Sequence, residues 1–164
     1  MSFSSIAFSV VCISVLSASA ACAEGICDDL KKILSFTEVG YRPLQSGFDF
    51  YLDEYKGSLI PLTFSECFTS PSAGSSEYKC LKKLPDDEAL AKRELATLVQ
   101  AVEACFGSQI VRRTGTSAQR PSYRKKDTGE SISMSISRYV PKDANNPPRY
   151  GLRLRVSIID PSAD

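Results

Sequence analysis

The sequence predicts an α+β fold in which two helices pack on one face of an antiparallel sheet. Two segments repeat apolar residues at helical spacing, and several others alternate apolar with polar residues as half-buried strands do. The predicted order of elements is α-β-β-β-α-β-β-β, which suits helices gathered on one face of an antiparallel sheet. Four cysteines beyond the N-terminal segment predict that this domain is also disulfide-bonded, because an even number of cysteines is typical of such domains.

The N-terminal segment has the layout of a secretory signal peptide. An apolar run near the start precedes a run of small residues, and the apolar run is too short to span a bilayer. Ala20 and Ala23 both end an A-x-A cleavage site, while Cys22 could instead be the lipidated first residue of a lipoprotein. We therefore expect a signal peptide over residues 1–23 and one exported domain, periplasmic or secreted, over residues 24–164.

The first half of that domain is predicted to begin with a helix and continue with strands. Residues 26–34 form one apolar helical stripe with acids first and lysines later, as the helix dipole favours. Phe48, Phe50 and Leu52 then alternate with other residues, as expected of a strand. A second strand is predicted beyond a break near Gly57.

A turn-rich connector and a second helix follow. Residues 69–76 consist mostly of turn-forming residues, and residues 77–81 predict a short returning strand. Pro85 and the acids after it are typical of a helix start, and Gly107 is typical of a helix end. Apolar residues between these positions share one helical face, so this is the clearest helix in the sequence.

The last third of the sequence is rich in predicted strands. Residues 119–126 predict one strand, and residues 131–137 alternate serine with isoleucine or methionine. Residues 150–158 alternate in the same way, with arginines between the apolar positions. A polar loop over residues 141–148 joins these last two strands, so we expect them to form a hairpin.

Four cysteines are predicted to form two disulfides. Cys27 and Cys105 lie on the apolar stripes of the two predicted helices, while Cys67 and Cys80 lie in consecutive predicted strands. Pairing helix with helix and strand with strand requires fewer coincidences of geometry than the other two connectivities. Metal binding is not expected, because no two cysteines have the close spacing of structural zinc sites and histidine is absent.

Charge is distributed unevenly although the net charge is only +1. Residues 24–106 carry nine basic and fourteen acidic side chains, whereas residues 107–164 carry eleven basic and five acidic ones. Basic clusters of this kind often form only a solvated face, but they can bind a protein or an anionic envelope component. The residues that we expect to form such a partner surface are Arg124, Lys125, Lys126, Arg149, Arg153 and Arg155.

A wider basic patch adds Arg112, Arg113 and Arg120 to these residues and has Tyr123, Tyr139 and Tyr150 nearby. Interleaved aromatic and basic residues are used by platforms that bind single-stranded nucleic acid. An exported protein rarely meets nucleic acid, however, and the net charge is not that of a typical nucleic-acid-binding domain. We therefore expect no nucleic-acid partner, and the sequence leaves the oligomeric state open.

Catalytic signals are weak. The absence of histidine excludes Ser-His-Asp and Cys-His mechanisms within this chain, and no glycine-rich phosphate loop is present, so no cofactor is expected. Two Ser-x-x-Lys matches and several neighbouring carboxylates remain, and each has an ordinary structural explanation. They are Ser76 with Lys79, Ser122 with Lys125, Asp28-Asp29, Asp53-Glu54 and Asp86-Asp87-Glu88.

By elimination, the sequence favours a non-catalytic exported binding protein of the cell envelope, such as an inhibitor, immunity or accessory protein. The first alternative is a small envelope enzyme that uses carboxylates or a Ser-Lys pair. The second is a structural subunit of an envelope or secretion complex.

Overall fold

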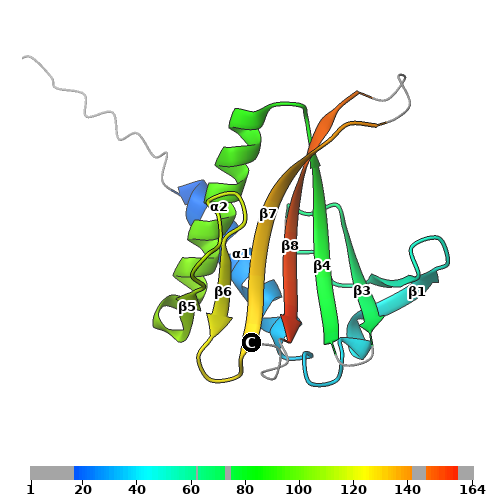
Figure 1. Cartoon of the computed structure of the whole chain (residues 1–164). Helices are drawn as coiled ribbons and strands as arrows, with labels where there is room; N and C mark the ends of the chain where they lie inside the picture. Colours follow the sequence, from blue (N-terminus) through cyan, green and yellow to red (C-terminus); the bar gives the residue numbers. More distant parts are fainter. Residues whose placement is uncertain (1–16, 62, 73–74, 142–146, 159–164) are drawn as a thin grey trace, which may run out of the picture.

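The computed structural model describes residues 17–61, 63–72, 75–141 and 147–158. It contains one antiparallel sheet of eight strands with two α-helices and two short 3₁₀ helices (Figure 1). The α+β class is therefore confirmed. The elements are α1 (Ser17–Leu34), η1 (Arg42–Leu44), β1 (Gln45–Asp49), β2 (Glu54–Gly57), β3 (Glu66–Ser72), β4 (Ser75–Leu84), α2 (Glu88–Phe106), η2 (Gly107–Gln109), β5 (Ile110–Arg112), β6 (Ser122–Lys125), β7 (Glu130–Tyr139) and β8 (Arg149–Ile158).

The spatial order of the strands is β1-β2-β3-β4-β8-β7-β6-β5. The last strand in sequence therefore lies at the centre of the sheet, between β4 and β7. The predicted order of elements was wrong, because four strands precede α2 and four follow it. One extra strand is the three-residue β5, and the other arises from the hairpin of β1 and β2.

That hairpin turns where the sequence predicted a continuous strand. Residues 50–53 form the turn, and the alternation of Phe48, Phe50 and Leu52 continues across it. The predicted break at Gly57 instead marks the end of β2, where a side chain would collide with the Tyr78 hydroxyl and the Cys67 Cβ atom. Glycine is needed there for close packing against β3 and β4.

The core lies against one face of the central strands. Met134 of β7, Leu154 of β8 and Cys80 of β4 occupy one row across the sheet, and each is about 1% exposed. Apolar side chains from both helices belong to the same buried cluster. They include Leu30, Ile33, Leu95, Leu98 and Val102.

Local signals explain both ends of α2. The Asp87 carboxylate accepts a hydrogen bond from the Leu90 amide at 2.9 Å, which caps the helix start one turn earlier than its first buried residues. Gly107 ends the helix with a φ of 47°, a left-handed value that glycine adopts readily. The helix therefore begins after the predicted Pro85 and ends where the sequence predicted.

α1 is longer than the predicted helix and begins at Ser17. Cys22 and the two expected cleavage points therefore fall within its first turns, while residues 1–16 of the expected signal peptide lie outside the described residues. The signal peptide stays a prediction. Beyond Leu34, a run of turns and η1 carries the chain to β1 at the edge of the sheet.

Two disulfides join these elements in the pairing expected from the sequence. Cys27 of α1 is bonded to Cys105 of α2, and Cys67 of β3 is bonded to Cys80 of β4. The first bond connects the two helices across 78 residues of sequence, and the second connects directly paired positions of neighbouring strands. One bond thus joins the two helices to each other, and the other joins β3 to β4.

A buried carboxylate connects the turn after α1 to the sheet. Glu130, at the start of β7, accepts hydrogen bonds from the hydroxyls of Thr37 and Thr128 and lies 3.2 Å from the Lys125 Nζ atom. Burial favours the neutral carboxyl, but these three partners outweigh burial and hold the pKa of Glu130 below its ordinary value. The charged form is therefore the one that the fold stabilises.

Candidate functional site

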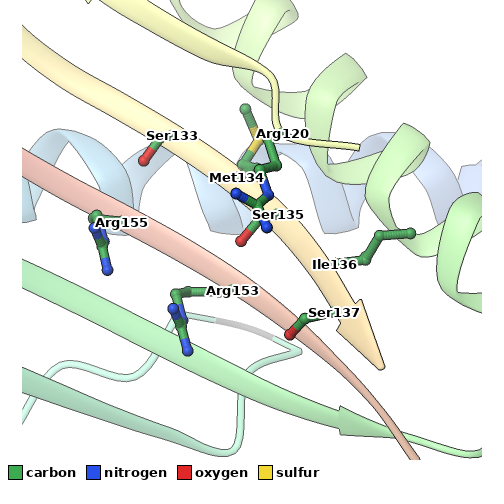
Figure 2. A pocket seen from close by; sticks show the side chains of 8 residues that line it. All are labelled: Arg120, Ser133, Met134, Ser135, Ile136, Ser137, Arg153 and Arg155. Carbon is green, nitrogen blue, oxygen red and sulfur yellow. The ribbon is translucent and has the colours of Figure 1, made fainter. Parts of the chain in front are cut away.

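The face of β7 and β8 opposite the core carries a regular pattern of hydroxyl and guanidinium groups. In the β7–β8 register, Ser133 pairs with Arg155, Ser135 with Arg153, and Ser137 with Gly151. Because successive side chains of a strand point to opposite faces, these residues share the face of the sheet opposite to that of Met134 and Leu154. Figure 2 shows the serine hydroxyls and both guanidiniums on one side of the two strands.

A third arginine reaches this face from the connection between β5 and β6. The Met134 amide donates a hydrogen bond to the Pro121 carbonyl at 2.9 Å, and the Ile136 amide donates one to the Gln119 carbonyl at 3.3 Å. Residues 119–121, which directly precede β6, therefore run alongside β7 and continue the line of β6. This path brings the Arg120 side chain over the serines of β7 (Figure 2).

These side chains line a surface hollow of about 310 Å³. In the described part of the chain, its lining comes from β7, β8 and residue 120, without any helix residue. We call it the serine–arginine groove and define it by Arg120, Ser133, Ser135, Ser137, Arg153 and Arg155.

The three guanidiniums differ in how far they are already paired. The Arg155 Nε atom lies 3.0 Å from a carboxylate oxygen of Glu77 on β4. Arg153 has Ser135 and Leu81 as its cross-strand neighbours, and both Arg153 and Arg120 are exposed. Neither of these two arginines forms an ion pair among the residues that the structure describes. Their donors are therefore available to a ligand.

The structure does not bring the six predicted partner-binding residues together. Arg124, Lys125 and Lys126 lie at the turn between β6 and β7, where Lys125 is occupied by Glu130. Arg149 lies at the opposite end of β8, with its guanidinium 5.6 Å from the centre of the Tyr139 ring. Arg149 and Arg155 are six positions apart along β8, a distance of about 20 Å. Of the predicted set, the groove contains Arg153 and Arg155.

Four groove residues were not among the six predicted partner-binding residues, although Arg120 was part of the wider basic patch considered for nucleic acid. The three serines lie in a predicted strand, and their alternation with apolar residues already indicated that they share one face. The register that places them opposite arginines could have been inferred from the hairpin. Arg120 could not have been found in this way, because its position depends on the tertiary path of residues 119–121.

The tyrosines near the wider basic patch do not form a stacking platform. Tyr123 points to the core side and donates a hydrogen bond to Glu103 of α2 at 2.5 Å. Burial and this carboxylate raise the pKa of Tyr123 to about 12. Tyr150 packs against the core, and Tyr139 lies under Arg149. Tyr139 is 55% exposed and lies two positions beyond the last groove serine on the same face of β7, but among the described residues the lining of the groove itself includes no aromatic ring on which a nucleic-acid base could stack.

The two candidate Ser-Lys pairs are separated by the sheet. Positions three apart on one strand face opposite sides, which applies to Ser76 and Lys79 on β4 and to Ser122 and Lys125 on β6. Lys79 bonds to Glu54 at 2.5 Å. Neither serine can use its own motif lysine as a base in this arrangement, so the geometry does not support this part of the enzyme alternative.

The candidate carboxylates largely have structural partners. Glu54 bonds to Ser70 and Lys79, and Asp87 caps α2. Asp86 forms two hydrogen bonds with Arg138, and the guanidinium lowers the pKa of this carboxyl. Within the described ranges, no cluster of three or more acidic or cysteine side chains is arranged to hold a metal ion.

The described helices include none that is long and apolar enough to cross a membrane. Comparison with models of protein families, with curated proteins and with solved structures gave no match to this chain in any of the three. What the groove does must therefore be inferred from its own chemistry. Guanidinium and hydroxyl groups are hydrogen-bond donors that suit carboxylate, phosphate or sulfate oxygens.

Proposed function

We propose that the protein is exported and acts as a non-catalytic binding protein of the cell envelope, such as an inhibitor, immunity or accessory protein. In this proposal, the serine–arginine groove holds an acidic segment of a protein partner. The observation that carries it is the placement of Arg120 and Arg153 on either side of the β7 serines. Their backbones are two strand spacings apart, about 10 Å, which leaves room for one extended segment between the guanidiniums.

An acidic protein segment fits this face better than an anionic bilayer does. Glu77 and Glu66 lie on the same face, paired with Arg155 and Lys83 at 3.0 and 3.4 Å. A broad anionic surface would meet these carboxylates as well as the arginines. A narrow segment that follows β7 would contact Arg120 and Arg153 and avoid both acids. The charges of Arg120 and Arg153 would then determine where the segment lies on the sheet more than they would raise its affinity.

Export is supported by the expected signal peptide together with the two disulfides. Disulfides persist in oxidising compartments and are rare in the cytosol of mesophiles. Both bonds join core elements, so the proposed compartment is one in which the fold can keep them. The same reasoning favours a partner that is itself exposed to the envelope or its exterior.

The test begins with protein purified from the envelope fraction, whose intact mass should show the loss of the first 20 to 23 residues. A partner captured with this protein at low salt is identified, purified and titrated against three single variants. Arg153→Glu and Arg120→Glu reverse charge in the groove. Arg93→Glu makes the same change at an exposed position of α2 and is the matched control.

Each groove variant should weaken binding about tenfold and reduce its dependence on salt, while Arg93→Glu leaves both unchanged. Equal affinity for all three variants would show that the groove is only a solvated face. If no protein partner is captured and phosphatidylglycerol vesicles bind the groove instead, its ligand is an anionic envelope component and not an acidic protein. A purified chain that still begins at Met1 would contradict export.

A further inference from the structure

The turn of the β1–β2 hairpin exposes three consecutive large apolar side chains. Phe50 is 86% exposed, Tyr51 100% and Leu52 52%. Such turns are usually built from glycine, asparagine, aspartate, serine or proline, which suit the backbone and the solvent. We call Phe50, Tyr51 and Leu52 the aromatic tip. In Figure 1 the hairpin projects from the sheet on the side away from α2.

The backbone of the tip is held by hydrogen bonds in which the side chains of residues 50–52 take no part. The Asp49 carboxylate accepts hydrogen bonds from the amides of Tyr51 at 3.0 Å and Leu52 at 3.3 Å. Asp53 completes the turn with a φ of 53°, a conformation that aspartate tolerates better than most residues. Polar residues at 51 and 52 would therefore allow the same turn, so the turn itself does not explain the exposed apolar residues at these two positions.

The aromatic rings of Phe48 and Tyr55 support the tip from the strands of the hairpin. Phe48 packs edge-on against Phe50 with ring centres 5.1 Å apart, and against Tyr55 with ring centres 4.9 Å apart. None of these three residues belongs to the buried core cluster. The hairpin thus has a small aromatic cluster of its own. Aromatic side chains held in this way lose little conformational entropy on binding, which suits them as anchors.

From these observations we infer that the aromatic tip inserts into an apolar pocket of a protein partner, and that the rim of this pocket is basic. The second part follows from charge. Asp49 and Asp53 flank the tip, and Lys56 is the only basic residue of the hairpin. These acids would repel the anionic surface of a bilayer, whereas Lys or Arg side chains around a pocket would complement them.

The tip is separate from the serine–arginine groove. β1 forms one edge of the sheet, and four strand spacings lie between β2 and β7. The two surfaces also have opposite charge, so they require different features of a partner. The inference about the tip does not depend on the proposed function of the groove.

A photo-crosslinking amino acid in place of Tyr51, which is fully exposed, tests the inference in cells that produce the full chain. The same amino acid in place of Thr97, an exposed residue of α2, is the control. The protein that crosslinks only from position 51 is identified by mass spectrometry and purified. Its affinity is then measured for the unmodified chain and for Phe50→Ser, Tyr51→Ser and Asp53→Lys. Val39→Ser, at another exposed apolar position, is the matched control.

Phe50→Ser and Tyr51→Ser should each weaken binding tenfold or more, and Asp53→Lys should weaken it several-fold, most clearly at low salt. Val39→Ser should bind as the unmodified chain does. The inference is overturned if position 51 crosslinks no more than position 97, if the tip variants keep full affinity, or if the crosslink joins two copies of this chain. Retention on phosphatidylglycerol vesicles that is lost in the tip variants would assign the tip to a bilayer instead.

Discussion

The two faces of the β7–β8 hairpin differ completely in chemistry although their residues alternate along the same strands. On one face Met134, Leu154 and Val156 are buried in the core. On the other, the serine–arginine groove is open and polar. The difference shows that one face of a hairpin can contribute to the stability of the fold while its other face remains available for binding. Neighbouring positions such as Arg153 and Leu154 should therefore affect different measurable properties.

The largest effect is expected from the disulfide that joins the two helices. Replacing Cys27 and Cys105 together by alanine should lower the free energy of unfolding by about 4.5 kcal/mol, because the bond closes a long loop in the unfolded chain. Replacing Cys67 and Cys80, which close a short loop, should lower it by about 3 kcal/mol. Urea denaturation measures both. A larger loss for the second pair would contradict the loop-length argument.

A pair of neighbouring substitutions tests the comparison itself. Leu154→Ala should lower the free energy of unfolding by about 3 kcal/mol, since it opens a cavity at a position that is 1% exposed. Arg153→Ala should change it by less than about 0.5 kcal/mol, because the side chain is exposed. Thermal and urea unfolding of both variants provide the measurement. Similar losses would mean that the open face also contributes to stability, and the separation of roles would fail.

A loss smaller than that of Leu154→Ala is expected at Glu130, the carboxylate buried on the core side, and it depends on pH. The pKa of Glu130 is lower in the folded chain than its ordinary value of 4.5. Its contribution is therefore complete well above pH 4.5 and is lost as the pH falls from there through the folded pKa. At pH 7, Glu130→Gln should lower the free energy of unfolding by about 1 to 2 kcal/mol.

The difference between wild type and Glu130→Gln should shrink as the pH falls below 4.5. Denaturation series at several pH values between 7 and 3 measure it. A difference that stays constant over this range would show that the charge of Glu130 contributes nothing and that only its shape matters.

The sequence predicted the parts of the fold that follow local rules. α2 has a capping aspartate, a terminal glycine and one apolar face, and β7 and β8 alternate without interruption, so each was predicted within a few residues. The disulfide pairing followed from these elements. Residues 48–53 misled the prediction, because alternating aromatic residues normally indicate a strand. The hydrogen bonds that the Asp49 carboxylate accepts, and that make this segment a turn, are visible only in three dimensions.

The site was predicted less well than the fold. Arg153 and Arg155 were chosen for their charge and their place opposite apolar residues, and the groove contains both. Charge alone also selected Lys125, whose partner Glu130 lies in the core, and Arg149, which lies at the far end of the strand. A count of basic residues cannot distinguish a cation that already has a partner from one that is available. That distinction requires the register and the loops.

The strict alternation along β7 and β8 also limits how the chain can misfold. Pairing that slipped by one residue would turn the whole set of side chains of one strand to the other face. Arginines would then enter the core while Leu152, Leu154 and Val156 faced water. Each such arginine would be buried without a counter-charge, so the slipped hairpin would be far less stable than the correct one. The arginines of the open face therefore disfavour the slipped register and help to specify the correct one, whether or not a partner is present.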